Sequence, residues 1–156
     1  MAAIYVLGER LFALPMSKTD VGVWAGLDAP SSSALTESDA GLGEFVDQAL
    51  NRSRTGRPHP PREQLNRLLD PLVRMAGVSR ASEFQRQAGL INIERGQGGY
   101  RAVRAVKVLE KGSSRVWFGE DAEARDLVSA SREELGAVIR ELATTPETIR
   151  SESRAR

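Results

Sequence analysis

The chain has 156 residues, of which 40% are apolar and 28% are charged, a composition typical of a globular protein and not of a disordered one. This length predicts one domain over residues 1–150, and the lack of an apolar run of about 18 residues argues against a membrane span, so we expect a cytoplasmic protein. With no cysteine and a single histidine, His59, the chain has no thiol nucleophile and lacks the usual zinc ligands, so we expect neither metal nor cofactor.

Charge is sorted along the chain, although the net charge is only +1. Basic residues number 2 against 7 acidic ones in residues 1–50, 14 against 5 in residues 51–115, and 6 against 9 in residues 116–156. The two ends are therefore acidic and the middle is basic. Such local fields steer charged partners even when the sum of charges is close to zero.

The first predicted elements are strands followed by a helix. Two short apolar runs within residues 4–17 flank Gly8-Glu9, which predicts a hairpin, and residues 21–26 predict a third short strand. After a polar loop, Ser38 is the expected N-cap of a helix. Apolar residues then recur at spacings of three and four, as in an amphipathic helix, at Leu42, Phe45, Val46, Ala49 and Leu50.

The middle of the chain predicts a helical insert. Prolines at residues 58–61 form a stiff entry, and leucines within 65–72 form an apolar stripe that Pro71 kinks or divides into two helices. Gly77 is the expected stop, and a further short helix should end near Ala88. The insert carries many arginines, including Arg52, Arg54, Arg57, Arg62, Arg67, Arg80 and Arg86.

The last third again predicts strands followed by a helix. Residues 96–99 form a turn between two strands, and a strand at 114–120 follows. Ser131 and Glu134 form a capping box that opens a helix through Leu142. Residues 151–156 are expected to be a flexible tail.

Residues 111–143 align without a gap on residues 18–50 at an offset of 93, with nine of 33 positions identical. We therefore expect an α+β fold in which two related strand-then-helix units form an antiparallel or mixed sheet packed with helices, with the helical insert between them. The two tryptophans of the chain are a matched pair, and each should fill the same space in its own unit. Paired glycines should let each helix approach the sheet closely. The predicted structural core thus includes Trp24, Trp117, Leu42, Gly43, Leu135 and Gly136.

Acidic residues are concentrated in the two predicted strand-to-helix connections. Their spacing matches neither a calcium loop nor an acid–base pair beside a nucleophile, so we expect no enzyme. They form either a solvated rim or, if the two units place them on one face, an electrostatic surface for a basic protein. These candidate binding residues are Asp28, Glu37, Asp39, Glu120, Asp121, Glu123 and Asp126.

Several segments together resemble the contact-dependent growth inhibition (CDI) immunity protein family. They are ALPMSKTDVGVW at 13–24, LGEFVDQAL at 42–50 followed by NRSR and HPP, AGVSRASEFQRQAGLINIE at 76–94, and RVWFGEDAE with LGAVIREL at 115–142. The resemblance covers residues 4–145. It implies a small cytoplasmic protein that binds and neutralises the C-terminal toxin domain, often a nuclease, of a large secreted effector.

Two other functions remain open from the sequence. The basic insert could bind nucleic acid as part of a regulator, although its few aromatic residues and the resemblance make nucleic acid the less favoured partner. A small hydrolase would have to use one of the acidic connections. We retain the toxin inhibitor as the main hypothesis.

Overall fold

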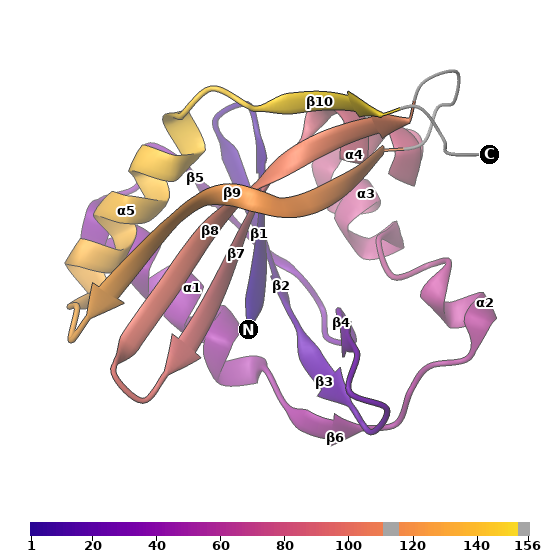
Figure 1. Cartoon of the computed structure of the whole chain (residues 1–156), viewed down its shortest axis with the longest axis horizontal. Helices are drawn as coiled ribbons and strands as arrows, with labels where there is room; N and C mark the ends of the chain where they lie inside the picture. The colour runs from indigo at the N-terminus through magenta and orange to yellow at the C-terminus, as the bar shows by residue number, and fades with distance from the viewer. Residues whose placement is uncertain (111–115, 153–156) are drawn as a thin grey trace.

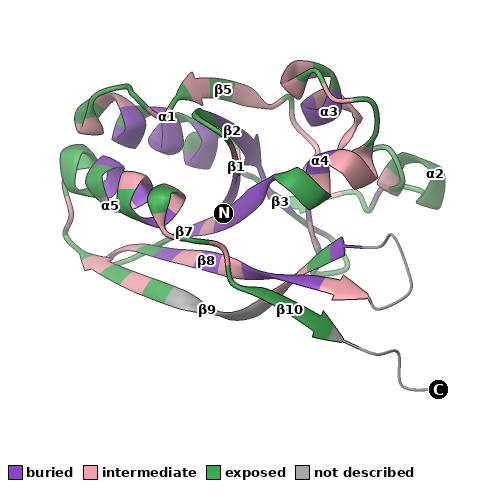
Figure 2. Ribbon diagram, turned by 90° about the horizontal axis from the view of Figure 1, so that it is seen from above, coloured by how far each residue is buried: buried purple, intermediate pink, exposed green. Residues whose placement is uncertain are grey.

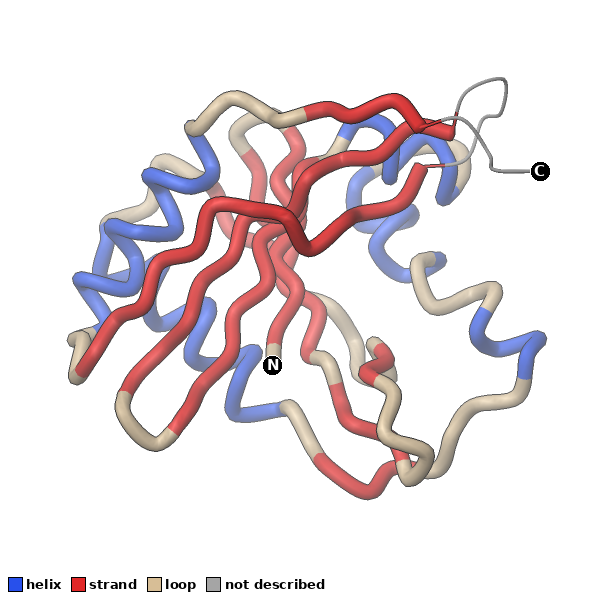
Figure 3. Tube along the Cα trace, in the orientation of Figure 1, coloured by secondary structure: helices blue, strands red, loops and turns tan. Residues whose placement is uncertain are grey.

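The computed structural model describes residues 1–110 and 116–152, and the side chains of these residues apart from 120–123 and 152. Runs of strands are separated by helices in an α+β arrangement (Figures 1 and 3). The strands are β1 (Ala2–Leu7), β2 (Arg10–Pro15), β3 (Ser17–Thr19), β4 (Trp24–Ala25), β5 (Ser31–Ala34), β6 (Thr55–Arg57), β7 (Gly89–Gly96), β8 (Gly99–Glu110), β9 (Val116–Val128) and β10 (Ile149–Glu152). The helices are α1 (Asp39–Arg52), α2 (Arg62–Leu65), α3 (Asp70–Ala76), α4 (Ala81–Gln87) and α5 (Arg132–Thr144).

Seven of the described strands form the main sheet. Their order is β10-β8-β7-β1-β2-β5, and β9 pairs with the other side of β8. Neighbours are antiparallel except β10 and β8, which are parallel. The predicted hairpins at Gly8-Glu9 and at residues 96–99 are confirmed. Three further described strands, β4, β3 and β6, form a small separate sheet.

Helices α1 and α5 cover one face of the main sheet. The alternation of side chains along β1 sends Ala2, Ile4 and Val6 to this face, where they meet buried residues of both helices (Figure 2). The predicted caps are confirmed, because Ser38 accepts from the Gly41 amide and the Ser131–Glu134 capping box is present. No helix among the described residues is long and apolar enough to cross a membrane.

Helices α3 and α4 cover part of the opposite face. Here Ala3 and Tyr5 of β1 and Phe12 of β2 pack against Leu72 of α3 and Phe84 of α4. A proline and a glycine divide the helical insert into separate helices. Pro71 stands in the first turn of α3, and Gly77 ends that helix in a left-handed conformation with φ 76°.

The paired glycines permit a close crossing of two helices, which differs from the expected approach of helix to sheet. A Cβ added at Gly43 would lie 1.7 Å from the backbone oxygen of Arg132, and one added at Gly136 would lie 1.7 Å from that of Asp39. The two contacts are equivalent in the alignment, because Gly43 corresponds to Gly136 and Asp39 corresponds to Arg132 at the offset of 93 residues. Leu42 and Leu135, beside these glycines, are fully buried.

The strands of the aligned segments do not match in this way. Trp24 lies half-buried in the two-residue β4 of the small sheet, whereas Trp117 lies in the 13-residue β9 of the main sheet. Trp117 is 49% exposed, so its assignment to the core is wrong. The expected connection at 120–126 is also wrong, because those residues continue β9, whose pairing with β8 resumes at Glu123 after a register shift. Pairing with β8 decided this, and a local pattern does not report such long-range pairing.

The end of the described chain is ordered by pairing, against the expectation of a flexible tail from residue 151. Ser151 and Glu152 belong to β10, and residues 153–156 lie outside the described residues. Before β10, the Glu147 carboxylate accepts a hydrogen bond of 2.6 Å from Nζ of the buried Lys107 in β8. The buried Arg104 donates a bond of 2.6 Å to the Leu142 carbonyl, so β8 holds both the end of α5 and the segment after it.

Candidate functional site

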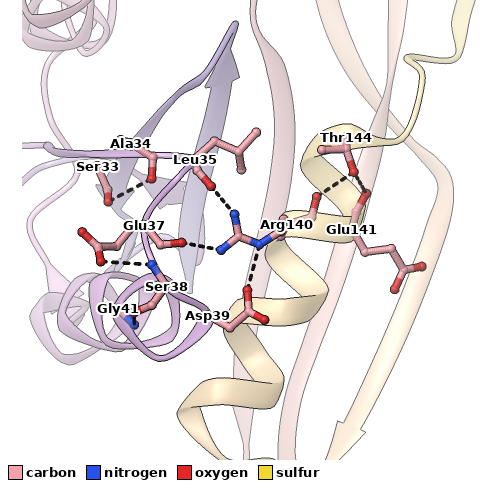
Figure 4. Close-up of polar contacts among 10 residues, drawn as sticks. All are labelled: Ser33, Ala34, Leu35, Glu37, Ser38, Asp39, Gly41, Arg140, Glu141 and Thr144. Atoms are coloured by element: carbon pink, nitrogen blue, oxygen red, sulfur yellow. Dashed lines mark hydrogen bonds and ion pairs between the residues drawn. The ribbon is translucent and has the colours of Figure 1, made fainter.

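The acidic residues Glu37 and Asp39, at the start of α1, serve mainly to hold the loop that leads into this helix (Figure 4). Arg140 of α5 donates to the carbonyl oxygens of Leu35 and Glu37, and its Nε donates to the Asp39 carboxylate at 2.8 Å. The Glu37 carboxylate accepts from the Ser38 amide. Asp39 therefore already has a cationic partner, which weakens its case as a contact for another protein.

Asp28 lies elsewhere, in the loop between β4 and β5. One of its carboxylate oxygens is buried without a hydrogen-bond partner among the described residues. A buried acceptor without a donor is costly, so this loop is a weak point of the structure.

The acidic residues of the second segment lie along β9. Asp126 is exposed and pairs across the strands with Arg101 of β8. Its neighbours Arg125 and Leu127 face α5 and the core beneath it, so Asp126 points to the opposite face of the sheet. Glu120, Asp121 and Glu123 belong to the same strand, and their side chains lie outside the described residues.

The structure thus places Asp39 and Asp126 on different faces of the sheet, while the side chains of Glu120, Asp121 and Glu123 lie outside the described residues. Asp39 belongs to the α1–α5 side, and Asp126 belongs to the other side of the sheet. The expectation of a shared acidic face rested on treating both segments as strand, loop and helix. Because β9 replaces the second loop, that expectation is wrong for Asp39 and Asp126.

The face that carries Asp126 also contains a cavity of about 480 Å³. We call this the sheet cavity. Helices α3 and α4 leave this part of β7, β8 and β9 uncovered, so alternate side chains of the strands are only half-buried or exposed. Its lining consists of Met1, Trp24, Asn92, Glu94, Arg101, Val103, Ala105 and Gly119.

The lining of the sheet cavity combines apolar surface with charges of both signs. Trp24, Val103 and Ala105 supply apolar contact area, while Glu94 and Arg101 are exposed. The Met1 amine donates to Ser53 Oγ at 3.1 Å. Burial lowers the pKa of this amine, and the nearby Glu94 carboxylate partly offsets the effect. Such a surface suits the binding of another macromolecule, with an aromatic anchor and charged groups around it.

Sequence reasoning missed most of this cavity. Trp24 drew attention as a core residue, but Arg101, Val103 and Ala105 were read only as parts of a strand. One signal was available, because these three residues alternate with Ala102 and Arg104 and so share one face of β8. That the helices leave this face uncovered was not visible in the sequence.

Comparisons with known proteins support the fold. No protein-family model and no curated protein matched the chain. Its structure is similar to a protein of unknown function from Neisseria meningitidis, with a TM-score of 0.71, 21% identity and 92% coverage of both chains. It is also similar to a chain of the CdiA-CT/CdiI toxin and immunity complex from Yersinia pseudotuberculosis, with a TM-score of 0.66, 16% identity, and coverage of 91% of this chain and 93% of that one.

Proposed function

We propose that this protein is an immunity protein that binds and neutralises the C-terminal toxin domain, a nuclease such as a tRNase, of a cognate CDI effector. One observation carries the proposal. The fold agrees over 91% of the chain with a chain from a toxin and immunity complex. Action against a delivered toxin would place the protein in the cytoplasm. Because fold alone does not determine function, the proposal needs a binding test.

The sheet cavity is the surface that we assign to the toxin domain. Half-buried Trp24 at its lining offers the kind of aromatic anchor that dominates binding energies at interfaces. Asp126 is exposed on the same face, and Glu120, Asp121 and Glu123 follow the same strand. A nuclease needs a basic surface to hold phosphates, so an acidic strand beside the cavity would attract and orient it.

Binding without chemistry is the second part of the proposal. The residues that line the sheet cavity include no serine, threonine or histidine, so its possible bases, Glu94 and the Met1 amine, have no nucleophile among the lining residues. Within the described residues, no three His, Asp or Glu side chains gather as they would around a metal ion. The purified chain alone should therefore hydrolyse neither nucleic acids nor model esters.

The test uses the C-terminal toxin domain of the cognate effector. Co-expression of the chain should restore growth to cells that make the toxin domain, and the two proteins should co-purify. Val103→Trp should abolish both effects, because the ring would fill the sheet cavity while a strand tolerates an aromatic residue.

Ala137→Trp is the matched control. It places the same ring on an exposed position of α5, on the other side of the sheet, and should leave protection intact. A toxin domain that fails to bind the wild-type chain would refute the function. If both variants lost protection equally, or if neither lost it, the assignment of the sheet cavity to toxin binding would be refuted.

A further inference from the structure

The arginines of the two helical layers differ in what they contact. Among the described residues of the α1–α5 side, four arginines are ion-paired, Arg95 and Arg132 with Asp47, Arg125 with Glu141, and Arg140 with Asp39, whereas the exposed Arg52 at the end of α1 is not. On the α2–α4 side, within residues 1–110 and 116–152, the guanidinium groups of four exposed arginines make no hydrogen bond or ion pair. These four, which we call the arginine surface, are Arg62, Arg67, Arg74 and Arg86.

The arginine surface lies on the outer side of the insert. Leu72 and Val73 of α3 and Phe84 of α4 are buried toward the sheet, which turns Arg74 and Arg86 to the solvent. Arg62 begins α2, and Arg67 lies in the turn that follows it. Helices α2, α3 and α4 lie together at one end of the molecule, away from α1 and α5 (Figures 1 and 2).

The residue types favour phosphate as the ligand. Residues 51–88 contain eight arginines, no lysine and three acidic residues, Glu63, Asp70 and Glu83. A guanidinium group binds a phosphate through two parallel hydrogen bonds. The four guanidinium groups of the arginine surface are unpaired and so are available to a polyanion.

The residues around the arginine surface favour the backbone of a nucleic-acid duplex as its ligand over an acidic protein or a single strand. Among the described residues, helices α2–α4 carry none of the exposed large apolar side chains, so an acidic protein would find no anchor there. The single aromatic residue of 51–88, Phe84, is fully buried and cannot stack on the bases of a single strand. Phosphates along a duplex require only accessible positive charge.

We propose that the arginine surface binds the phosphate backbone of double-stranded nucleic acid without reading its sequence. This inference does not rest on the proposed toxin binding, because it concerns a different surface from the sheet cavity. Backbone contact of this kind releases counterions, so the affinity should fall steeply as salt is raised.

Fluorescence anisotropy with labelled duplexes of about 20 base pairs, one of RNA and one of DNA, tests the proposal at salt concentrations from about 50 to 200 mM. The double variant Arg67→Gln/Arg74→Gln should weaken binding roughly tenfold at the lowest salt and flatten the salt slope by about two. The control Lys18→Gln/Arg52→Gln removes the same charge from exposed side chains of β3 and α1 and should bind almost as wild type. Circular dichroism confirms that each variant is folded.

Each outcome decides the matter. Tighter binding of the RNA duplex than of the DNA duplex would identify A-form geometry as the preferred source of phosphate, and the reverse would identify DNA. Equal loss in the control variant would show that only net charge matters and would overturn the proposal. Failure of the wild-type chain to bind either duplex would also overturn it. If the same variant then weakened toxin binding, the arginine surface would belong to an acidic protein partner.

Discussion

The two faces of the main sheet are covered in different ways. On one face, α1 and α5 cross so closely that glycine is required at both contact points, and Arg132 and Arg140 of α5 are held by carboxylates of α1. On the other face, the short helices α3 and α4 pack through aromatic residues, leave the sheet cavity open and carry unpaired arginines. The first face satisfies its own polar groups, whereas the second leaves apolar surface and charge available to partners.

This difference suggests which part of the molecule supports function. A close helix pair with internal ion pairs is a rigid support for the strands beneath it. An open face of the same sheet then presents side chains whose positions are fixed by that support. Substitutions on the α1–α5 side should therefore change stability, and substitutions in the sheet cavity should change binding.

The largest effect on stability is expected for Gly43→Ala. The new Cβ would overlap the Arg132 carbonyl oxygen, which is backbone and cannot move aside without separating α1 from α5. We expect a loss of at least about 3 kcal/mol in the free energy of unfolding, or failure to fold. Urea denaturation followed by circular dichroism measures it.

Gly98→Ala is the control for this prediction, since a Cβ there would meet no atom within 4 Å. It should change the free energy of unfolding by less than about 0.5 kcal/mol. Similar stabilities of the two alanine variants would mean that the close crossing of α1 and α5 does not exist.

The second prediction concerns Tyr5 on the α3–α4 side. Burial raises the pKa of Tyr5 from 10.0 to about 12, so the folded state keeps the phenol protonated where the unfolded state ionises. Stability from this group is complete below pH 10 and is lost as the pH rises toward 12, by about 2–3 kcal/mol. Tyr5→Phe should remove this part of the pH dependence.

Denaturation at pH 9, 10 and 11 compares the wild-type chain with the phenylalanine variant. As the pH rises, the wild-type chain should lose stability relative to the variant. If the wild-type chain is the more stable at pH 9, the two free energies of unfolding converge. Otherwise their difference grows in favour of the variant. A constant difference across these values would show that Tyr5 is exposed to solvent, against its 8% exposure here.

A smaller effect is expected for Asp47→Asn on α1. Asp47 is buried and accepts from Arg95 of β7 and from Arg132 of α5 at 3.1 Å. Both arginines are partly exposed, so water would replace part of the lost interaction, and we expect a loss of about 1–2 kcal/mol. Thermal unfolding measures the change.

Glu44→Gln on the exposed side of the same helix controls for the change of charge. It should shift the midpoint of unfolding by no more than about 2 °C. An equal shift for Asp47→Asn would mean that this carboxylate does not tie α1 to the strands.

The parts predicted from the sequence are those fixed by neighbouring residues. Ser38, Ser131 and Glu134 cap helices through contacts three residues away, and Gly77 ends α3 through its own conformation, so a local pattern contains the cause. The aligned segments pointed to paired glycines, but only the structure shows that these glycines face another helix.

What could not be predicted depends on distant pairing. The sequence around Trp117 is compatible with a short strand and a loop, and pairing with β8 extends it into β9. Ile149 lies in a polar segment of the sequence. It pairs in parallel with Lys107 of β8, which is 42 residues away along the chain. The sheet cavity depends on how far α3 and α4 extend over the sheet, which no local pattern reports.

Hydrogen–deuterium exchange of the chain, alone and with the toxin domain bound, tests whether the sheet cavity binds that domain. Binding there should slow the exchange of backbone amides in β7, β8 and β9 and near Trp24, the elements that border the sheet cavity. Slower exchange confined to α1 and α5, with β8 and β9 unchanged, would contradict binding at the sheet cavity.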